Sequence, residues 1–263
     1  MKKLISATAL SLAASALPAA ASPTKPTIVL VHGAFETADV WAQVITTLEK
    51  DGYAVKNVEL PGRTGNEKPM SEISLALYQQ TVATAIADEK GPVVLVGHSF
   101  GGFTISAEAE AEPEKIKTLV YIAAYLPKNG DSLLALATAD KDSKLGPLLE
   151  IDKEQGFAAV KSGMGGGVFA SDGPMPVQDA ASAAVVNEPL APLATAVMLT
   201  PARFGKVDKV AIRTLRDNVI SPGFQASMIA RTPVRLSMTI DTGHVPFITQ
   251  PDALAVEIEK AAK

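Results

Sequence analysis

Residues 93–102 read VVLVGHSFGG, four branched apolar residues followed directly by the pattern G-x-S-x-G. The apolar run predicts a buried strand, and residues 103–107 continue with a helical pattern. A strand that turns this sharply into a helix needs residues without bulk two positions before and after the serine, and Gly97 and Gly101 occupy those positions. This context predicts a nucleophile elbow, in which the Ser99 hydroxyl stands above a helix N-terminus that favours developing negative charge.

Similar apolar runs alternate with helical patterns along the rest of the chain. Near-continuous apolar strands separated by helices are typical of an α/β fold with a mostly parallel sheet. The expected strands are Thr27–Val31, Val93–Val96, Thr118–Ala124, Val210–Leu215 and Arg235–Ile240, with a weaker candidate at Tyr53–Leu60.

Residues 128–200 interrupt this alternation, because no strand stands out among their Ala-rich pieces and the glycine cluster at 165–167. A segment of this length between two sheet strands predicts a cap inserted over the edge of the sheet, with a pair of long crossover helices as the alternative. Its methionines at 164, 175 and 198 could line an apolar pocket, although packing between helices is the commoner role for such residues.

Composition excludes several other classes of protein. The chain has 263 residues, of which 47% are hydrophobic and 20% charged, enough for one large domain or two small ones. Its net charge of -4, without a basic block, gives no electrostatic reason to bind nucleic acid. The absence of cysteine excludes disulfides, thiolate metal sites and a cysteine nucleophile, and three histidines leave little for a metal site. We therefore expect neither a metal nor a cofactor.

The N-terminus has the pattern of a secretory signal peptide. Two lysines precede a charge-free run at 4–17, and three alanines at 19–21 follow Pro18. The run is shorter than the about 20 residues that span a membrane, so we expect no integral membrane association. Cleavage after residue 21 would leave 22–263 as the mature domain, in the periplasm or secreted from a bacterium. A buried N-terminal helix is the alternative.

The base that activates Ser99 is sought among three histidines. His98 flanks the serine on the elbow, so its side chain cannot easily reach the hydroxyl. His32 belongs to the loop after the first strand, where holding loop structure is its expected role. His244 follows the predicted strand at 235–240, and ligands bind at this carboxyl end of strands in open α/β sheets. His244 is therefore the expected base.

The acid that orients His244 should follow the preceding strand. Asp217 comes directly after the strand at 210–215, in the chain order serine, acid, histidine. A turn or capping role is the alternative for Asp217, because Asp is common in turns. Asp131 is the second candidate, and Asp241 is a poorer one because it shares the short loop of His244.

An oxyanion hole needs two backbone N–H groups. One is expected from Phe100, the residue after the serine, and the other from the loop His32-Gly33-Ala34-Phe35 after the first strand. Gly33 allows a close approach of the backbone. The second donor is assigned to Ala34, with Phe35 as the near alternative.

Five segments together resemble one family, the α/β-hydrolase superfamily. They are IVLVHGAF at 28–35, VVLVGHSFGG at 93–102, YIAAYLP at 121–127, VAIRTLRD at 210–217 and TGHVPF at 242–247. Within the superfamily, the chain looks like the branch of plant methyl-ester esterases and hydroxynitrile lyases with their bacterial esterase relatives. The resemblance covers most of the chain after residue 21 and fades across the cap. It implies a doubly wound sheet with an inserted cap, a triad of Ser99, Asp217 and His244, and oxyanion donors at Ala34 and Phe100.

Two positions separate the chemistries of this branch. Plant lyases of this type carry Thr after the loop histidine and Lys after the catalytic histidine, whereas this chain has Gly33 and Val245. These two departures point to ester hydrolysis. Together with the signal-peptide pattern, we expect a secreted serine hydrolase for small to medium, largely apolar carboxylic esters. The alternatives are amide, lactone or carbon–carbon cleavage, hydroxynitrile lyase chemistry, and a catalytically slow ligand-binding protein. The sequence contains no indication of the oligomeric state.

Overall fold

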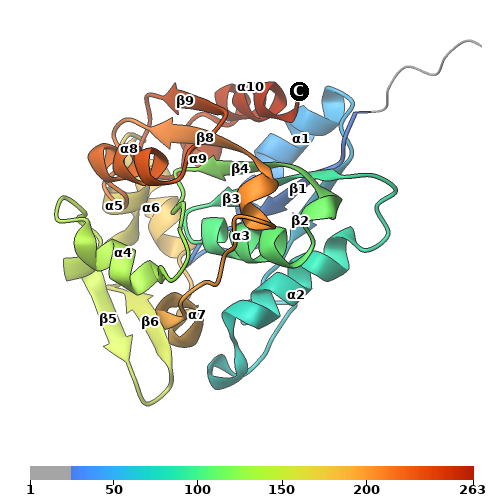
Figure 1. Ribbon diagram of the computed structural model, residues 1–263. Coiled ribbons are helices and arrows are strands. Elements are labelled where there is room, and N and C mark those ends of the chain that lie inside the picture. The colour runs from blue at the N-terminus through green and yellow to red at the C-terminus, as the bar shows by residue number, and fades with distance from the viewer. Residues whose placement is uncertain (1–24) are drawn as a thin grey trace, which may run out of the picture.

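A parallel sheet of six strands forms the centre of the molecule, which the computed structural model describes from residue 25 to residue 263 (Figure 1). The predicted signal peptide, residues 1–21, lies outside the described residues. Each of the six stretches expected to be strands, including the weak candidate, overlaps one strand of this sheet. The strands are β1 (Ile28–Val31), β2 (Val55–Val58), β3 (Val93–His98), β4 (Ile116–Ile122), β8 (Asp208–Thr214) and β9 (Leu236–Ile240).

The strand order β2-β1-β3-β4-β8-β9 changes direction between β1 and β3. Ligands bind at the carboxyl ends of the strands at such a point, because the connections leave in opposite directions and open a crevice. Val31 is in register with Gly97, so β1 and β3 end at the same level. The loop after β1 and the turn after β3 are therefore neighbours at this crevice.

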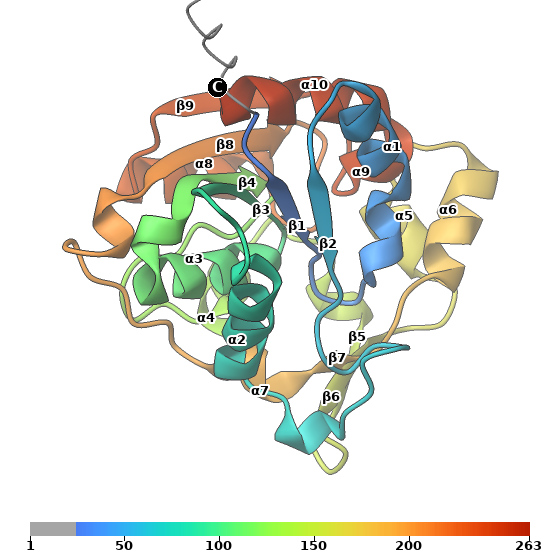
Figure 2. The same cartoon turned by 90° about the vertical axis from the view of Figure 1, so that its right-hand side faces the viewer.

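Helices cover both faces of the sheet, which makes it doubly wound as the resemblance implied. α1 (Ala42–Lys50) and α10 (Pro251–Ala262) pack together on one face, and α2 (Leu75–Ile86) and α3 (Gly101–Ala111) on the other (Figure 2). Because both faces are covered, β1 and β3 are buried along their whole length, which is why they read as continuous apolar runs. Outside residues 128–200, the other α-helices are α8 (Pro222–Arg231) and α9 (Pro246–Thr249). The short 3-10 helices there are η1 (Ala38–Trp41), η2 (Met70–Glu72), η3 (Pro113–Lys115) and η5 (Phe204–Lys206).

The chain between β4 and β8 forms a separate layer of short elements beside the carboxyl ends of the strands (Figure 1). No strand stands out in the sequence of residues 128–200, but three short strands form an antiparallel sheet there. These strands have only four, four and two residues, too few to stand out as apolar runs. The elements are α4 (Leu133–Ala139), η4 (Gly146–Leu148), β5 (Leu149–Asp152), β6 (Phe157–Val160), α5 (Gly165–Phe169), α6 (Met175–Ala183), β7 (Glu188–Pro189) and α7 (Leu190–Ala194).

The helices of this inserted layer, called the cap below, are also short. The longest, α6, has nine residues, so the alternative of two long crossover helices is wrong. Met164, Met175 and Met198 are 49%, 64% and 69% exposed, and they neither line the cavity described below nor pack in the interior. Between residues 25 and 263, no helix combines the length and apolarity that a membrane crossing requires.

Candidate active site

The turn between β3 and α3 holds Ser99 in a strained backbone conformation. Its φ of 50° lies in the left-handed region that residues with a side chain rarely adopt. The turn has no room for side chains at its glycines: a Cβ on Gly97 would lie 2.8 Å from the backbone of Gly101, and one on Gly102 would overlap the carbonyl oxygen of Tyr125. This crowding explains why the sequence needs glycines here, and it fixes Ser99 at the carboxyl end of β3.

His244 and Asp217 meet at the same end of the sheet. The His244 Nδ1 lies 2.9 Å from Asp217 Oδ2, and both residues are buried. Asp217 Oδ1 accepts hydrogen bonds from the backbone N–H groups of Val219 and Ile220, at 2.7 and 3.0 Å. These donors compensate the burial of a negative charge and fix the direction of the carboxylate. With Nδ1 donating to Asp217, the His244 Nε2 is left as the acceptor of the ring.

The other two acid candidates do not contact His244. Asp131 Oδ2 accepts the backbone N–H of Lys128 and lies 3.5 Å from an Arg231 nitrogen. Asp241 has a side chain that is 72% exposed and pairs with Arg216 at 2.9 Å. The geometry therefore favours Asp217 as the partner of His244.

In the loop after β1, the backbone donors on both sides of Ala34 are engaged. Gly33 N–H donates to Glu36 Oε2 at 2.7 Å, and Phe35 N–H donates to Glu188 Oε2 at 3.0 Å. The N–H groups of Ala34 and Phe100 donate to no acceptor within residues 25–263. Since Phe35 is engaged, the arrangement favours Ala34 and Phe100 as the pair that an oxyanion would meet.

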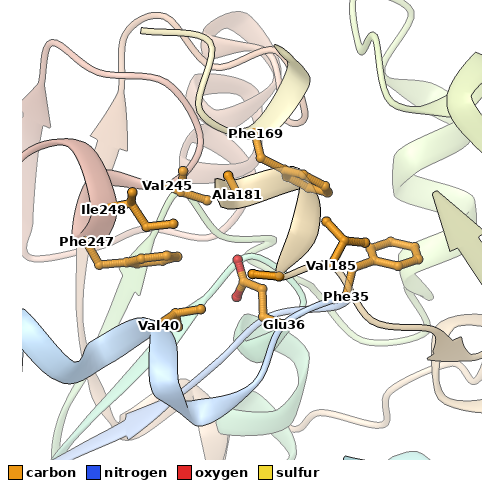
Figure 3. Close-up of a pocket in the computed structure, with 10 residues that line it drawn as sticks. Phe35, Glu36, Val40, Phe169, Ala181, Val185, Val245, Phe247 and Ile248 are labelled. Carbon is orange, nitrogen blue, oxygen red and sulfur yellow. The ribbon is translucent and has the colours of Figure 1, made fainter. Parts of the chain in front are cut away.

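His98 does not turn toward Ser99 but links the two loops of the site. Its Nε2 donates to the backbone oxygen of His244 at 2.9 Å, and its Nδ1 lies 3.0 Å from Glu36 Oε2. The same Glu36 oxygen holds Gly33, so one buried pair connects the loop after β1 with the loop of His244. Figure 3 shows the Glu36 carboxylate pointing among the apolar side chains of a pocket of about 30 Å³ behind this loop.

Glu36 and His98 stabilise each other's charged forms. Burial by itself raises the pKa of Glu36. The attraction of His98 and its hydrogen bond, the attraction of His244 and the hydrogen bond from the Gly33 N–H together outweigh burial, and the pKa is lowered from 4.5. Burial by itself lowers the pKa of His98. The attraction of Glu36 and its hydrogen bond, the hydrogen bond to the His244 carbonyl and the attraction of Asp217 together outweigh burial, and the pKa is raised from 6.5. Both ring nitrogens of His98 face oxygen acceptors, so the pair is an imidazolium facing a carboxylate, and both residues are buried.

Glu36 is a residue of the site that the sequence pattern did not single out. The available indication was a glutamate three residues after Gly33, one of two acidic residues in the stretch AFETADVW. His32, by contrast, has the expected role of holding loops, since its Nδ1 lies 2.8 Å from the Gly33 oxygen and its Nε2 accepts the N–H of Leu60 at 3.2 Å.

An apolar cavity of about 380 Å³ opens beside Ser99, between the sheet and the cap. The loops of the sheet contribute Ala34, Phe35 and Ser99, and most of the remaining wall is Leu, Ile, Ala and Phe from the cap. Tyr125 and Lys153 are the polar or charged side chains of the wall besides Ser99. Such a cavity favours a ligand that is uncharged and mainly apolar near the reacting atoms. Within the described part of the chain, no cluster of His, Asp and Glu is arranged to hold a metal ion.

Comparison with known proteins establishes the family. Residues 28–257 match the model of the alpha/beta hydrolase family, so the chain belongs to this family, as its resemblance predicted. It is 33% identical over 247 residues to putative methylesterase 11 of Arabidopsis thaliana, a match that covers 86% of this chain and 61% of that protein. It is 27% identical over 240 residues to a pyrethroid hydrolase of Sphingobium wenxiniae, covering 88% of this chain and 85% of that one.

The solved structures agree in fold. A crystal structure of polyneuridine aldehyde esterase matches with a TM-score of 0.80 at 21% identity, over 91% of this chain and 100% of that chain. At this identity the likeness shows the fold alone. The chain spans less than two thirds of the length of the Arabidopsis methylesterase 11, at 61%.

We expect the Glu36–His98 pair to stabilise the protein in a limited pH window. Both charges are fully formed between the ordinary pKa values of 4.5 and 6.5. The contribution is lost as pH falls through the lowered pKa of Glu36, and again as pH rises through the raised pKa of His98. The difference in free energy of unfolding between wild type and Glu36→Gln, from urea denaturation at a series of pH values, should therefore be largest inside this window. The exposed Glu154→Gln is the control, and a Glu36→Gln difference that does not vary with pH would contradict the ion pair.

Proposed function

We propose that the protein is a serine carboxylic-ester hydrolase that acts on small to medium, largely apolar esters. One observation carries the proposal: a serine in a strained elbow lines an apolar cavity, and two backbone N–H groups beside it donate to no acceptor among the described residues. The relatives named methylesterase and pyrethroid hydrolase support ester hydrolysis in particular. The signal-like residues 1–21 support export to the periplasm or the medium. The test is whether a chain that begins at Ser22 is recovered from the periplasm or the medium.

In the proposed reaction, the Ser99 hydroxyl attacks the ester carbonyl carbon while His244 Nε2 accepts its proton. The carbonyl electron pair moves to oxygen, where the N–H groups of Ala34 and Phe100 stabilise the negative charge. Collapse of this intermediate breaks the ester bond, and the imidazolium of His244 protonates the departing alcohol. A water molecule then repeats the cycle on the acyl-enzyme, with His244 again as base. Asp217 holds the His244 tautomer and stabilises its cation.

The surroundings of Gly33 argue against the cyanohydrin alternative. A Cβ at this position would lie 2.8 Å from the Ser99 Cβ and 3.0 Å from His98 Nδ1, so a threonine does not fit. Val245, where the plant lyases carry lysine, is buried and lines the small pocket behind the His244 loop. Val245 therefore offers departing cyanide no ammonium group at the place where the plant lyases have one, and the mainly apolar wall of the cavity disfavours that anion.

Ser99→Ala should abolish ester hydrolysis and leave the fold intact, because no other hydroxyl occupies the elbow. Losing the nucleophile of such a triad lowers kcat by on the order of a million-fold. The measurement is hydrolysis of p-nitrophenyl butyrate by the purified variant, with circular dichroism and thermal melting to show that it is folded. Unchanged activity in a pure, folded Ser99→Ala protein would remove the basis of the proposal.

Asp217→Asn should lower kcat by about ten-thousand-fold, because an amide favours the wrong imidazole tautomer. The matched control is Asp131→Asn, an aspartate that lies after β4 and contacts Lys128 and Arg231 instead of His244. We expect Asp131→Asn to keep most of the wild-type rate on the same ester. If Asp131→Asn were the crippling change, the acid assignment would be wrong.

Small uncharged esters and mandelonitrile together separate hydrolysis from cyanohydrin cleavage. We expect measurable release of p-nitrophenol from short-chain esters and little release of cyanide, because the oxyanion hole and base suffice only for the first reaction. A parallel assay on matched amides tests the remaining hydrolytic alternative. Efficient cyanide release with negligible ester hydrolysis would overturn the proposal, and turnover of no substrate at all would favour a ligand-binding protein.

A further inference from the structure

The cap holds Phe35, in the loop after β1, by both of its backbone polar groups. The N–H of Phe35 donates to Glu188 Oε2 at 3.0 Å, and its carbonyl oxygen accepts the N–H of Val186 at 3.0 Å. Glu188 begins β7, so both contacts come from one short segment of the cap. Phe35 has a φ of 64°, in the left-handed region that a bulky residue adopts only under constraint. The two hydrogen bonds to the cap supply that constraint.

Glu188 is itself fixed by a buried polar network. Its side chain is fully buried and pairs with the guanidinium of Arg63, which is also buried. The Tyr78 hydroxyl donates to Glu188 Oε1 at 3.1 Å. Arg63 Nε also donates to the backbone oxygen of Glu36 at 2.8 Å, so the network reaches the loop after β1 at two successive residues.

The free N–H of Ala34 lies between two anchored neighbours. Glu36 holds the N–H of Gly33, and Glu188 holds the N–H of Phe35. Because the peptide groups on both sides are held, the direction of the Ala34 N–H is set although this N–H itself makes no hydrogen bond to the described residues. A donor that is aimed before the reaction begins stabilises an oxyanion without a reorganisation cost.

We propose that Glu188 is a positioning residue of the cap, which aims the Ala34 N–H at the oxyanion through its contact with Phe35. The inference rests on the proposed ester hydrolysis. If Glu188 has this role, the oxyanion hole is complete only when the β7 segment packs against the loop after β1. Packing alone does not require this residue type, because apolar side chains of similar volume often stabilise a protein interior as well as a buried ion pair does. What a carboxylate adds at this position is an acceptor for the Phe35 N–H.

The experiment compares ligands that do and do not form an oxyanion. An aryl trifluoromethyl ketone adds the Ser99 oxygen to its carbonyl carbon, the carbonyl electron pair becomes the oxyanion, and the serine proton passes to His244. The matching aryl methyl ketone occupies the same cavity without forming this adduct. Inhibition constants for both ketones, together with kcat and KM for p-nitrophenyl butyrate, separate positioning of the donor from general damage to the cavity.

Two variants test Glu188. Glu188→Ala combined with Arg63→Met removes the acceptor and its cation together, so no uncompensated charge stays buried. We expect its kcat to fall about 100-fold with KM nearly unchanged, and its affinity for the trifluoromethyl ketone to fall in parallel. Glu188→Gln retains a carbonyl oxygen for the Phe35 N–H, so its loss should be smaller, about tenfold. Binding of the methyl ketone should change little in either variant.

Asp140→Asn is the matched control. Asp140 is also a buried cap carboxylate that accepts a backbone N–H from the other layer, that of Ser221 at 2.7 Å, but it does not contact the loop after β1. The Asp140→Asn variant should have a lower melting temperature but an unchanged ratio of the two inhibition constants.

Three outcomes would count against the inference. A folded double variant with wild-type kcat overturns it, as does an equal loss of affinity for both ketones. If the double variant does not fold, an unchanged ratio of inhibition constants in Glu188→Gln overturns it. A wild-type protein that hydrolyses no ester and forms no adduct overturns the proposed function itself, which distinguishes the two failures.

Discussion

Ser99 has a backbone φ of 50°, and the arrangement of the site depends on the packing that holds it there. The turn is closed by contacts that leave no space for a Cβ at Gly97, Gly101 or Gly102, where backbone atoms of the neighbouring turns and strands lie too near. A strained residue persists only where the surrounding structure determines its conformation. Here the buried strands β1, β3 and β4 supply that structure. The packing that buries the sheet therefore also holds Ser99 so that it faces the cavity.

Three buried carboxylates organise the loops around Ser99. Each has a positively charged or ring-nitrogen partner and at least one backbone N–H donor: Asp217 with His244, Glu36 with His98, and Glu188 with Arg63. A buried charge is costly unless it is paired and hydrogen-bonded, so each carboxylate fixes the loops that supply its donors. This explains how loops from four strands and the cap can hold one geometry beside an apolar cavity.

The comparison of strand prediction with structure shows where local patterns suffice. β1 and β3 lie between helices on both faces, and their apolar runs are direct consequences of that burial. β5 and β6 are short and partly exposed, and β7 has only two residues, so the same criterion missed them. The methionines of the cap show the same limit, because an apolar residue in a thin layer can face the solvent and the sequence does not mark which one does.

The amino-acid sequence by itself was enough to predict the six main strands, the elbow at Ser99 and a histidine at the end of β9, because each depends on residues within one short segment. The sequence also ranked Asp217 ahead of Asp131 and Ala34 ahead of Phe35, but left both alternatives open. Only the tertiary structure shows Asp217 in contact with His244 and the N–H of Phe35 engaged, and it alone introduced Glu36 into the site. The reason is separation along the chain. Phe35 meets Glu188 across 153 residues and His98 meets the His244 backbone across 146, and no local pattern of apolar and polar residues encodes such contacts.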